Sequence, residues 1–170
     1  GEGDLFLFYG WFKNVERVKG GGWKFDKKSP DLHVIFGYLE VGEMMPLENI
    51  EPPEWLSYHP HVKCKEEFGR LNHIFKGNEK LSLNENIPGA GYLKKPYILT
   101  AHNQSKRSLW NLPASFLDAE DRCLLSYHQK RKGSPSKLGN GFREVENVAR
   151  GQEFVVKMSK EIKEWVKRLF

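Results

Sequence analysis

Two short apolar runs near the start of the chain give its clearest pattern. Residues 3–12 and residues 33–41 are rich in aromatic and β-branched side chains and are bounded by Gly and charged residues. Apolar runs of this length are typical of strands that are buried on both faces. We therefore expect two paired strands, joined by a mobile loop at residues 19–30. That segment is Gly-rich, cationic and carries two aromatic residues, and a loop of this kind on a rigid sheet is where we expect a ligand.

Weaker patterns between residues 42 and 100 predict smaller elements. The adjacent Pro52 and Pro53 forbid a helix through that point, although residues 54–58 can form a helical turn. Short alternating apolar groups predict further strands. These strands are expected at residues 72–78, 80–83 and 97–100. Between the last two, the glycines of residues 88–93 predict a turn.

In the C-terminal part of the chain, helix signals become more prominent than strand signals. Pro113 can open a short helix that carries Phe116, and residues 151–156 form a strand-like run. The clearest helix is residues 159–170, where Ser159 can act as the N-cap and apolar residues recur at i, i+3, i+4 and i+7. These apolar residues are Ile162, Trp165, Val166 and Leu169. We expect this helix to pack on the sheet.

Together these elements predict an α+β fold. The sheet is expected to be curved and mostly antiparallel, or to form a small barrel, with the C-terminal amphipathic helix closing it. A chain of 170 residues suits one domain with a single core. No apolar run approaches the ~18 residues of a membrane-spanning helix, so we do not expect a membrane protein. Cys64 and Cys123 are too few for a disulfide framework, which favours reduced thiols in a cytoplasmic protein.

Charge and aromatic content favour an anionic partner. The formal net charge is +5 and the sequence pI is about 9.1, which suits nucleic acid or nucleotides and equally fits an unspecialised basic surface. Tryptophan is well suited to stack on a base. Of the five tryptophans, we expect Trp110 and Trp165 to be buried and Trp11, Trp23 and Trp55 to be exposed.

The histidines are the candidate acid and base groups. His59 and His61 flank Pro60, and on an extended segment both rings would lie on one side, about 7 Å apart. No third metal ligand occurs at a recognisable spacing, so we expect hydrogen-bonded or phosphate-facing imidazoles and no metal site. His128 is a further candidate acid or base. The sequence does not indicate a cofactor.

Several sequence blocks in a row resemble those of one family, the nucleotide modification associated domain 3 family. The blocks are residues 3–12, 33–39, 59–61, 108–113, 125–128 and 150–154. The resemblance implies that the protein handles nucleotides or modified nucleic acid, without naming a reaction. Family members carry additional Ser/Arg/Lys/Gly-rich sequence ahead of the first strand, so an N-terminal portion is expected to be missing here. Residues 3–12 and 33–41 also resemble the barrel hairpin of PUA-like domains, some of which recognise modified bases.

Two functions follow as hypotheses. The leading one is an enzyme-like nucleotide or nucleic-acid modification protein. In that protein His59, His61 and His128 act as acid, base or phosphate contacts. Phosphate is held by Arg107, Arg131 and Arg150, and the base pocket is shaped by Trp11, Tyr38 and Trp110.

The alternative is a reader that binds a modified base in an aromatic pocket and catalyses nothing. An interaction domain in a larger modification system is a third possibility. Convergence of the histidines would favour the enzyme, and an aromatic box would favour the reader.

Overall fold

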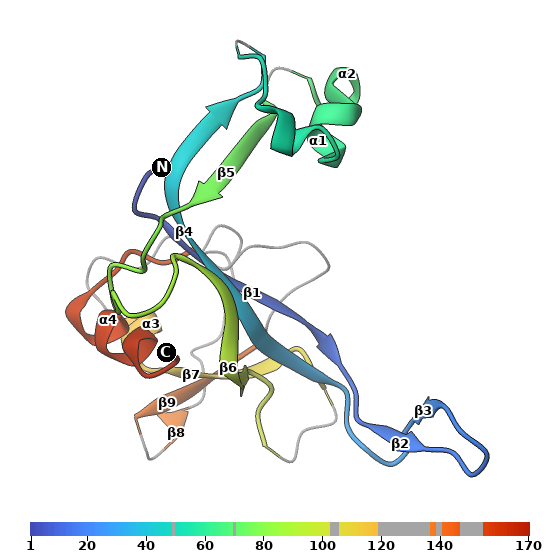
Figure 1. Ribbon diagram of the computed structural model, residues 1–170. Coiled ribbons are helices and arrows are strands. Elements are labelled where there is room, and N and C mark those ends of the chain that lie inside the picture. The colour runs from blue at the N-terminus through green and yellow to red at the C-terminus, as the bar shows by residue number, and fades with distance from the viewer. Residues whose placement is uncertain (49, 70, 103–105, 119–136, 139–140, 147–154) are drawn as a thin grey trace. The chain divides into compact units, whose positions relative to one another are not determined.

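The computed structural model describes residues 1–48, 50–69, 71–102, 106–118, 137–138, 141–146 and 155–170. Its strands are β1 (Leu5–Phe12), β2 (Val15–Arg17), β3 (Trp23–Phe25), β4 (Leu32–Pro46), β5 (His73–Gly77), β6 (Ala90–Ile98), β7 (Leu109–Pro113), β8 (Lys137–Leu138) and β9 (Phe142–Glu146). Its helices are the 3₁₀ helix η1 (Glu54–Leu56) and α1 (Pro60–Lys63), α2 (Lys65–Phe68), α3 (Ser115–Asp118) and α4 (Lys160–Lys167). Figure 1 follows these elements along the chain.

The strands form three sheets. One has the order β1-β4-β5, with β6 also paired to β4; the others are β2-β3 and β7-β9-β8. The pairs β2–β3, β4–β5, β7–β9 and β8–β9 are antiparallel. The fold is therefore α+β with mostly antiparallel sheets. The described strands do not close into a barrel, so the PUA-like barrel is not confirmed.

The long strand β4 is the centre of the largest sheet. It pairs with β1, β5 and β6, and buried side chains occur at both odd and even positions along it, among them Val34, Ile35 and Val41. The prediction of a strand buried on both faces is correct for β4. It is wrong for β1, because Phe6 and Phe8, which share one face of the strand, are exposed, so the described residues cover that face only in part.

Three local predictions also need correction. The loop expected at 19–30 contains strand β3, which pairs with β2 to make a hairpin. Residues 80–83 form no strand: Leu81 makes a single bridge to Asn84. Most of the turn expected at residues 88–93 is strand: residues 90–93 belong to β6 (Ala90–Ile98), and Gly89 immediately precedes it. The strand-like run at 151–156 lies almost wholly outside the described residues.

The chain forms two compact units. Unit 1 comprises Gly1–Phe8 and Gly37–Tyr92, and unit 2 comprises Tyr9–Phe36 and Leu93–Phe170. An apolar cluster of unit 1 is formed by Met45, Leu47, Leu56 and Ile74. Ile50 and Val62 pack against it, which fixes η1 and α1 on the end of the β4–β5 pair.

In unit 2, the end of the chain packs through aromatic contacts. Ser159 caps α4, with its hydroxyl accepting a hydrogen bond from the Ile162 N–H at 3.2 Å. Trp165 is buried and packs edge-on against Tyr97 and Phe116, with ring centroids 5.2 and 5.1 Å apart. Phe116 lies on the short helix α3 that follows Pro113. Among the described helices, none has the length and apolar composition to cross a membrane.

Candidate nucleotide-binding site

Alternate residues along β1 and at the start of β4 place polar and aromatic side chains together in unit 2. Successive side chains on a strand point to opposite faces, so Tyr9, Trp11 and Lys13 share one face of β1 and its extension. Asp31 and His33 are related in the same way on the neighbouring segment. The contacts described next show that these two sets meet.

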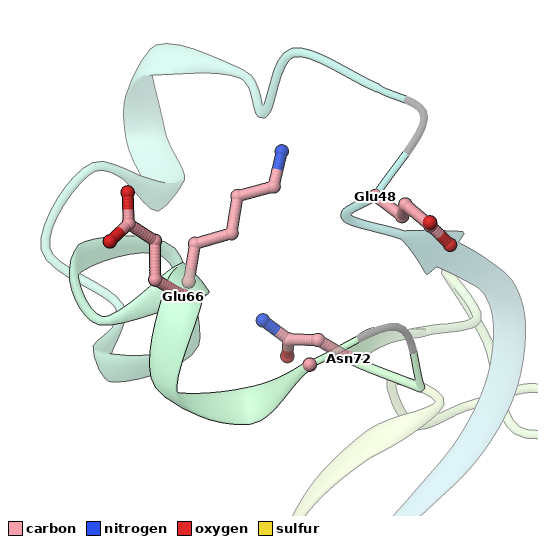
Figure 2. Close-up of a pocket in the computed structure, with 5 residues that line it drawn as sticks. Glu48, Glu66 and Asn72 are labelled. Atoms are coloured by element: carbon pink, nitrogen blue, oxygen red, sulfur yellow. The ribbon is translucent and has the colours of Figure 1, made fainter.

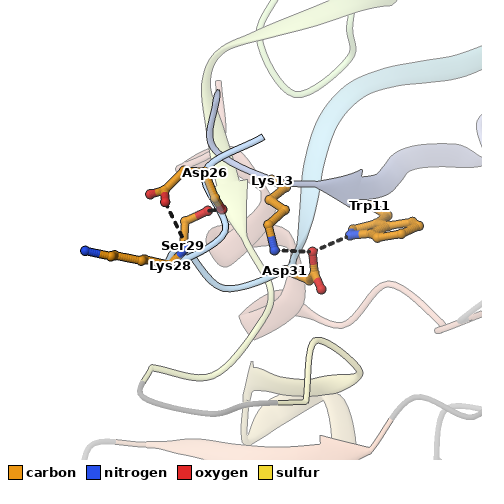
Figure 3. A network of polar contacts seen from close by, with 6 residues as sticks. All are labelled: Trp11, Lys13, Asp26, Lys28, Ser29 and Asp31. Carbon is orange, nitrogen blue, oxygen red and sulfur yellow. Dashed lines mark hydrogen bonds and ion pairs between the residues drawn. The ribbon is translucent and has the colours of Figure 1, made fainter. Parts of the chain in front are cut away.

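A hydrogen-bonded network fixes the indole of Trp11. Its Nε1 donates to Asp31 Oδ1 at 3.1 Å, and Lys13 Nζ donates to the same oxygen at 3.3 Å. Figure 3 shows both contacts converging on one carboxylate. The indole hydrogen bond lowers the pKa of Asp31 below its ordinary value of 3.8, and Lys13 and the charge of Arg107 act in the same direction. Asp31 is therefore a carboxylate at neutral pH.

A cationic side chain lies over the ring of Trp11. The Arg107 guanidinium carbon lies 4.4 Å from the ring centroid, the geometry of a cation–π contact. Thr100 positions this arginine: its buried hydroxyl donates to the Arg107 carbonyl at 2.9 Å and accepts from the His33 backbone N–H at 2.8 Å. Trp11 nevertheless stays 61% exposed. The result is a flat, cationic and solvent-accessible surface.

A second aromatic group, formed by Tyr9, His33 and Trp110, is linked to this surface through Thr100, which bonds both His33 and Arg107. The Trp110 Nε1 donates to His33 Nδ1 at 3.0 Å, and the Tyr9 ring lies 4.9 Å from the ring of Trp110 and 5.4 Å from that of His33. An indole nitrogen can only donate, so His33 Nδ1 must accept and the neutral ring carries its proton on Nε2. Burial, and then the charge of Arg107, lower the pKa of His33 below 6.5.

In unit 1, His59 and His61 lie at the start of a helix and not on an extended segment, which corrects the sequence prediction. His59 is the N-cap of α1, and its Nδ1 accepts from the His61 backbone N–H at 3.3 Å. The two ring centroids are 5.4 Å apart. The helix starts here because Pro60 occupies its first position, where no N–H is needed.

Asn72 orients His61. The Asn72 side-chain nitrogen donates to the His61 carbonyl at 2.9 Å, and its Oδ1 lies 2.7 Å from His61 Nδ1. Because that oxygen is an acceptor, His61 Nδ1 is the donor and the Nε2 lone pair is left available in the neutral ring. The His61 ring also stacks on Phe68, with centroids 4.1 Å apart.

Asn72 also lines an open hollow of about 440 Å³. Figure 2 shows Glu66 on α2, Glu48 just after β4, and Asn72 between them. Lys65 and Gly69 complete the lining. The hollow is thus bordered by charges of both signs and adjoins the residue that holds His61.

The structure brings some of the predicted site residues into contact and buries others. Trp11 and Arg107 are in direct contact, and His59 and His61 form a pair. Tyr38 is a core residue of unit 1: it is 4% exposed, and its hydroxyl donates to the Pro88 carbonyl at 3.0 Å. Trp110 is buried against His33. His128, Arg131 and Arg150 lie outside the described residues.

Sequence reasoning did not name several residues that the structure places at these sites. They are Tyr9, Lys13, Asp31, His33, Phe68, Asn72 and Thr100. The alternation of Tyr9, Trp11 and Lys13 was a usable signal, since it predicts one shared strand face. The His61–Asn72 pair had no such signal. Among the described residues, no three His, Cys, Asp or Glu side chains are grouped so that they could hold a metal ion.

One of three comparisons with known proteins gives a match. The sequence model of a family described as nucleotide modification associated domain 3 matches residues 1–157, which is most of the chain. No curated protein and no solved structure gives a significant match. The matched stretch includes both the Trp11–Arg107 contact and the His59–His61 pair, and the chain belongs to the nucleotide modification associated domain 3 family.

Proposed function

We propose that this protein binds the base of a nucleotide, free or within nucleic acid, on the ring of Trp11. The observation that carries the proposal is the exposed indole with the Arg107 guanidinium 4.4 Å from its centre. Family membership supports a role in nucleotide modification. A base is flat and polarisable, so it stacks on an indole or on a guanidinium with little dependence on its identity.

The surrounding groups prepare this surface for a phosphorylated ligand. The bond from Trp11 Nε1 to Asp31 keeps the indole in one orientation, so little side-chain entropy is lost on binding. Lys13 and Arg107 supply cationic donors beside the ring, while the Asp31 carboxylate balances one of the two charges. The base of a nucleotide can therefore stack on the Trp11 ring while its phosphate contacts Lys13 and Arg107.

Replacement of Trp11 by Ala tests the proposal. Stacking on an aromatic ring is worth about 1–3 kcal/mol per base, so Trp11→Ala is expected to weaken binding of deoxynucleoside monophosphates about 5- to 150-fold. Arg107→Lys keeps the charge but loses the planar contact, and a smaller loss is expected. Calorimetric titration with unmodified and 5-methylated pyrimidine nucleotides measures both.

Trp55→Ala is the matched control, because Trp55 is exposed to a similar extent, 63% against 61% for Trp11. Its loss is expected to leave nucleotide binding unchanged. Wild-type affinity in Trp11→Ala, or an equal loss in the two variants, would contradict the assignment of the base to Trp11.

A second candidate function is catalysis at His61, and the bond to Asn72 favours it. This bond places the proton on Nδ1 and turns Nε2 into a base with a fixed direction. An oriented imidazole with a free nitrogen is the usual general base of enzymes. His59, next to it in the same turn, is available as the matching acid.

This second function is tested by product analysis. His59→Ala and His61→Ala are expected to abolish turnover of a nucleotide substrate, followed by the mass of nucleotides after incubation with the protein. His73→Ala removes an exposed imidazole whose Nδ1 lies 2.9 Å from the Leu71 carbonyl oxygen and serves as the control. Turnover that persists in both His59→Ala and His61→Ala would exclude a catalytic role for the pair.

A further inference from the structure

The hairpin formed by β2 and β3 presents an unusual surface. Its strands pair antiparallel, with Val15 opposite Phe25, Glu16 opposite Lys24 and Arg17 opposite Trp23. Three glycines turn the chain at the tip. They are Gly20, Gly21 and Gly22, with φ of 101°, 105° and 87°, values that side-chain-bearing L-residues rarely adopt. In Figure 1 the hairpin continues outward from the ends of β1 and β4.

The two faces of the hairpin differ in chemistry. Directly opposed residues share a face and faces alternate along a strand, so Val15, Phe25, Arg17 and Trp23 lie on one side. Trp23 is 69% exposed and Phe25 is 66% exposed. The other face carries the ion pair between Lys24 and Glu16, at 3.0 Å. The first face is therefore apolar and aromatic, with one arginine beside the rings.

The segment that contains the hairpin is basic. Residues 13–28 contain six Lys or Arg and two Asp or Glu, a net charge of +4. Exposed aromatic rings interleaved with cations are the features with which proteins hold single-stranded nucleic acid: the bases stack on the rings and the phosphates meet the cations.

We propose that the β2–β3 hairpin binds single-stranded nucleic acid, with bases stacked on Trp23 and Phe25. Arg17 and the lysines that flank the two strands contact the phosphates. This inference rests on the proposed function and extends it, because it makes the substrate a polynucleotide: one base sits on Trp11 and neighbouring nucleotides are held by the hairpin. A second macromolecule, an anionic membrane surface, would also meet an aromatic and basic hairpin, and the experiment separates the two.

The test measures binding of the full chain to three probes. They are a fluorescein-labelled single-stranded dT12 oligonucleotide, the mononucleotide dTMP, and vesicles containing phosphatidylserine. The double variant Trp23→Ala/Phe25→Ala is expected to bind dT12 at least about 30-fold more weakly, since two stacked bases are lost. Binding of dTMP, which is proposed to use the Trp11 surface and not the hairpin, is expected to stay unchanged.

A charge variant tests the phosphate contacts separately. Lys19→Gln/Lys27→Gln/Lys28→Gln is expected to reduce the salt dependence of dT12 binding, lowering the slope of log K against log salt by about 2, or ~0.7 for each lost contact. The variant Lys157→Gln/Lys160→Gln/Lys163→Gln loses the same charge elsewhere and is expected to keep the wild-type slope. Circular dichroism confirms that all variants are folded.

The outcomes separate the two proposals. One outcome is that the hairpin variants lose dT12 binding while Trp11→Ala leaves the affinity for dTMP unchanged. This result would overturn the proposed function and keep the hairpin inference. Wild-type dT12 binding in both hairpin variants would overturn the hairpin inference and leave the Trp11 surface intact. Hairpin-dependent binding to vesicles without binding to dT12 would also overturn it, in favour of a membrane surface.

Discussion

The side chain of His33 shows how a buried hydrogen bond fixes the chemistry of a residue. Trp110 donates to its Nδ1, so protonation at that nitrogen would break the bond and leave two donors facing each other. Burial and the charge of Arg107 already lower the pKa of His33. The folded protein therefore resists protonation of this ring, whereas the unfolded chain does not.

This difference gives a pH dependence with a defined sign. Above about pH 6.5, the ordinary pKa of histidine, both states are neutral at this residue and it adds no dependence. Below that pH the unfolded chain binds the proton first, so the free energy of unfolding falls as the pH is lowered. The slope is a fraction of the ~1.4 kcal/mol per pH unit of one full proton, because solvent screens the half-buried ring.

The variant His33→Asn isolates this effect. An Asn side-chain oxygen can accept from Trp110 and does not titrate, so urea unfolding between pH 5 and 7 is expected to show a flatter dependence than in wild type. An unchanged slope would show that His33 binds a proton equally in both states.

Burial of individual aromatic residues was predictable from the sequence, but their partners were not. Trp110 and Trp165 are buried and Trp11, Trp23 and Trp55 are exposed, as expected from the apolar patterns around them. The bond between Trp110 and His33 joins residues 77 positions apart. Such a contact depends on sheet register, which local patterns do not contain.

At the scale of elements, the sequence predicted the type of most segments better than their limits. A continuous apolar run predicted β4, alternating apolar groups predicted β5, and the helical turn expected after the Pro52–Pro53 pair is seen as η1. Strand β7 was not predicted, because its run Leu109–Pro113 is short and ends in proline. Strand β3 (Trp23–Phe25) was assigned to a loop and β2 (Val15–Arg17) was not predicted, because each has only three residues and three consecutive glycines lie between them.

Close backbone packing where β6 begins gives a prediction for Gly89. A Cβ at this position would lie 2.4 Å from the Asn78 carbonyl oxygen, and the Gly89 carbonyl accepts from the Glu40 N–H at 2.7 Å. Backbone atoms on both sides leave no room to relax. Gly89→Ala is therefore expected to lower the free energy of unfolding by about 1–3 kcal/mol or more, measured by urea denaturation.

Gly10→Ala is the matched control, because it also adds a methyl group to a glycine, but the nearest atom belongs to a side chain that can move. A Cβ there would first meet a Phe12 ring carbon at 3.3 Å, and that ring can rotate. We expect a loss below about 1 kcal/mol, since alanine also restricts the unfolded chain. Equal unfolding midpoints for the two variants would show that the Asn78 backbone yields as readily as the Phe12 ring.

For the whole molecule, the sequence indicated a basic protein but not where the charge is functional. The family match covers residues 1–157 and ends before α4 (Lys160–Lys167). Residues 13–28 carry a net charge of +4, and residues 130–137 carry the same net charge in a shorter run. A uniform basic surface and separate basic segments can have the same pI, so the pI does not show where the charge lies.

This uneven charge predicts different behaviour for variants of equal net charge. Lys19→Gln/Lys27→Gln/Lys28→Gln is expected to elute from a cation exchanger at clearly lower salt than wild type, because the local potential governs adsorption. Lys157→Gln/Lys160→Gln/Lys163→Gln is expected to shift much less. Co-elution of the two triple variants would show that overall charge, and not its position, determines the interaction.

The glycines at the tip of the hairpin have one further consequence. Their positive φ angles belong to the half of conformational space that mirror-image amino acids prefer, so a semisynthetic chain with D-alanine at Gly21 would keep the turn while narrowing the freedom of the unfolded peptide. L-alanine at the same position would instead cost about 1–2 kcal/mol. The chirality of the residue at position 21 would thus determine whether the turn keeps Arg17 and Trp23 paired across the hairpin or lets them separate.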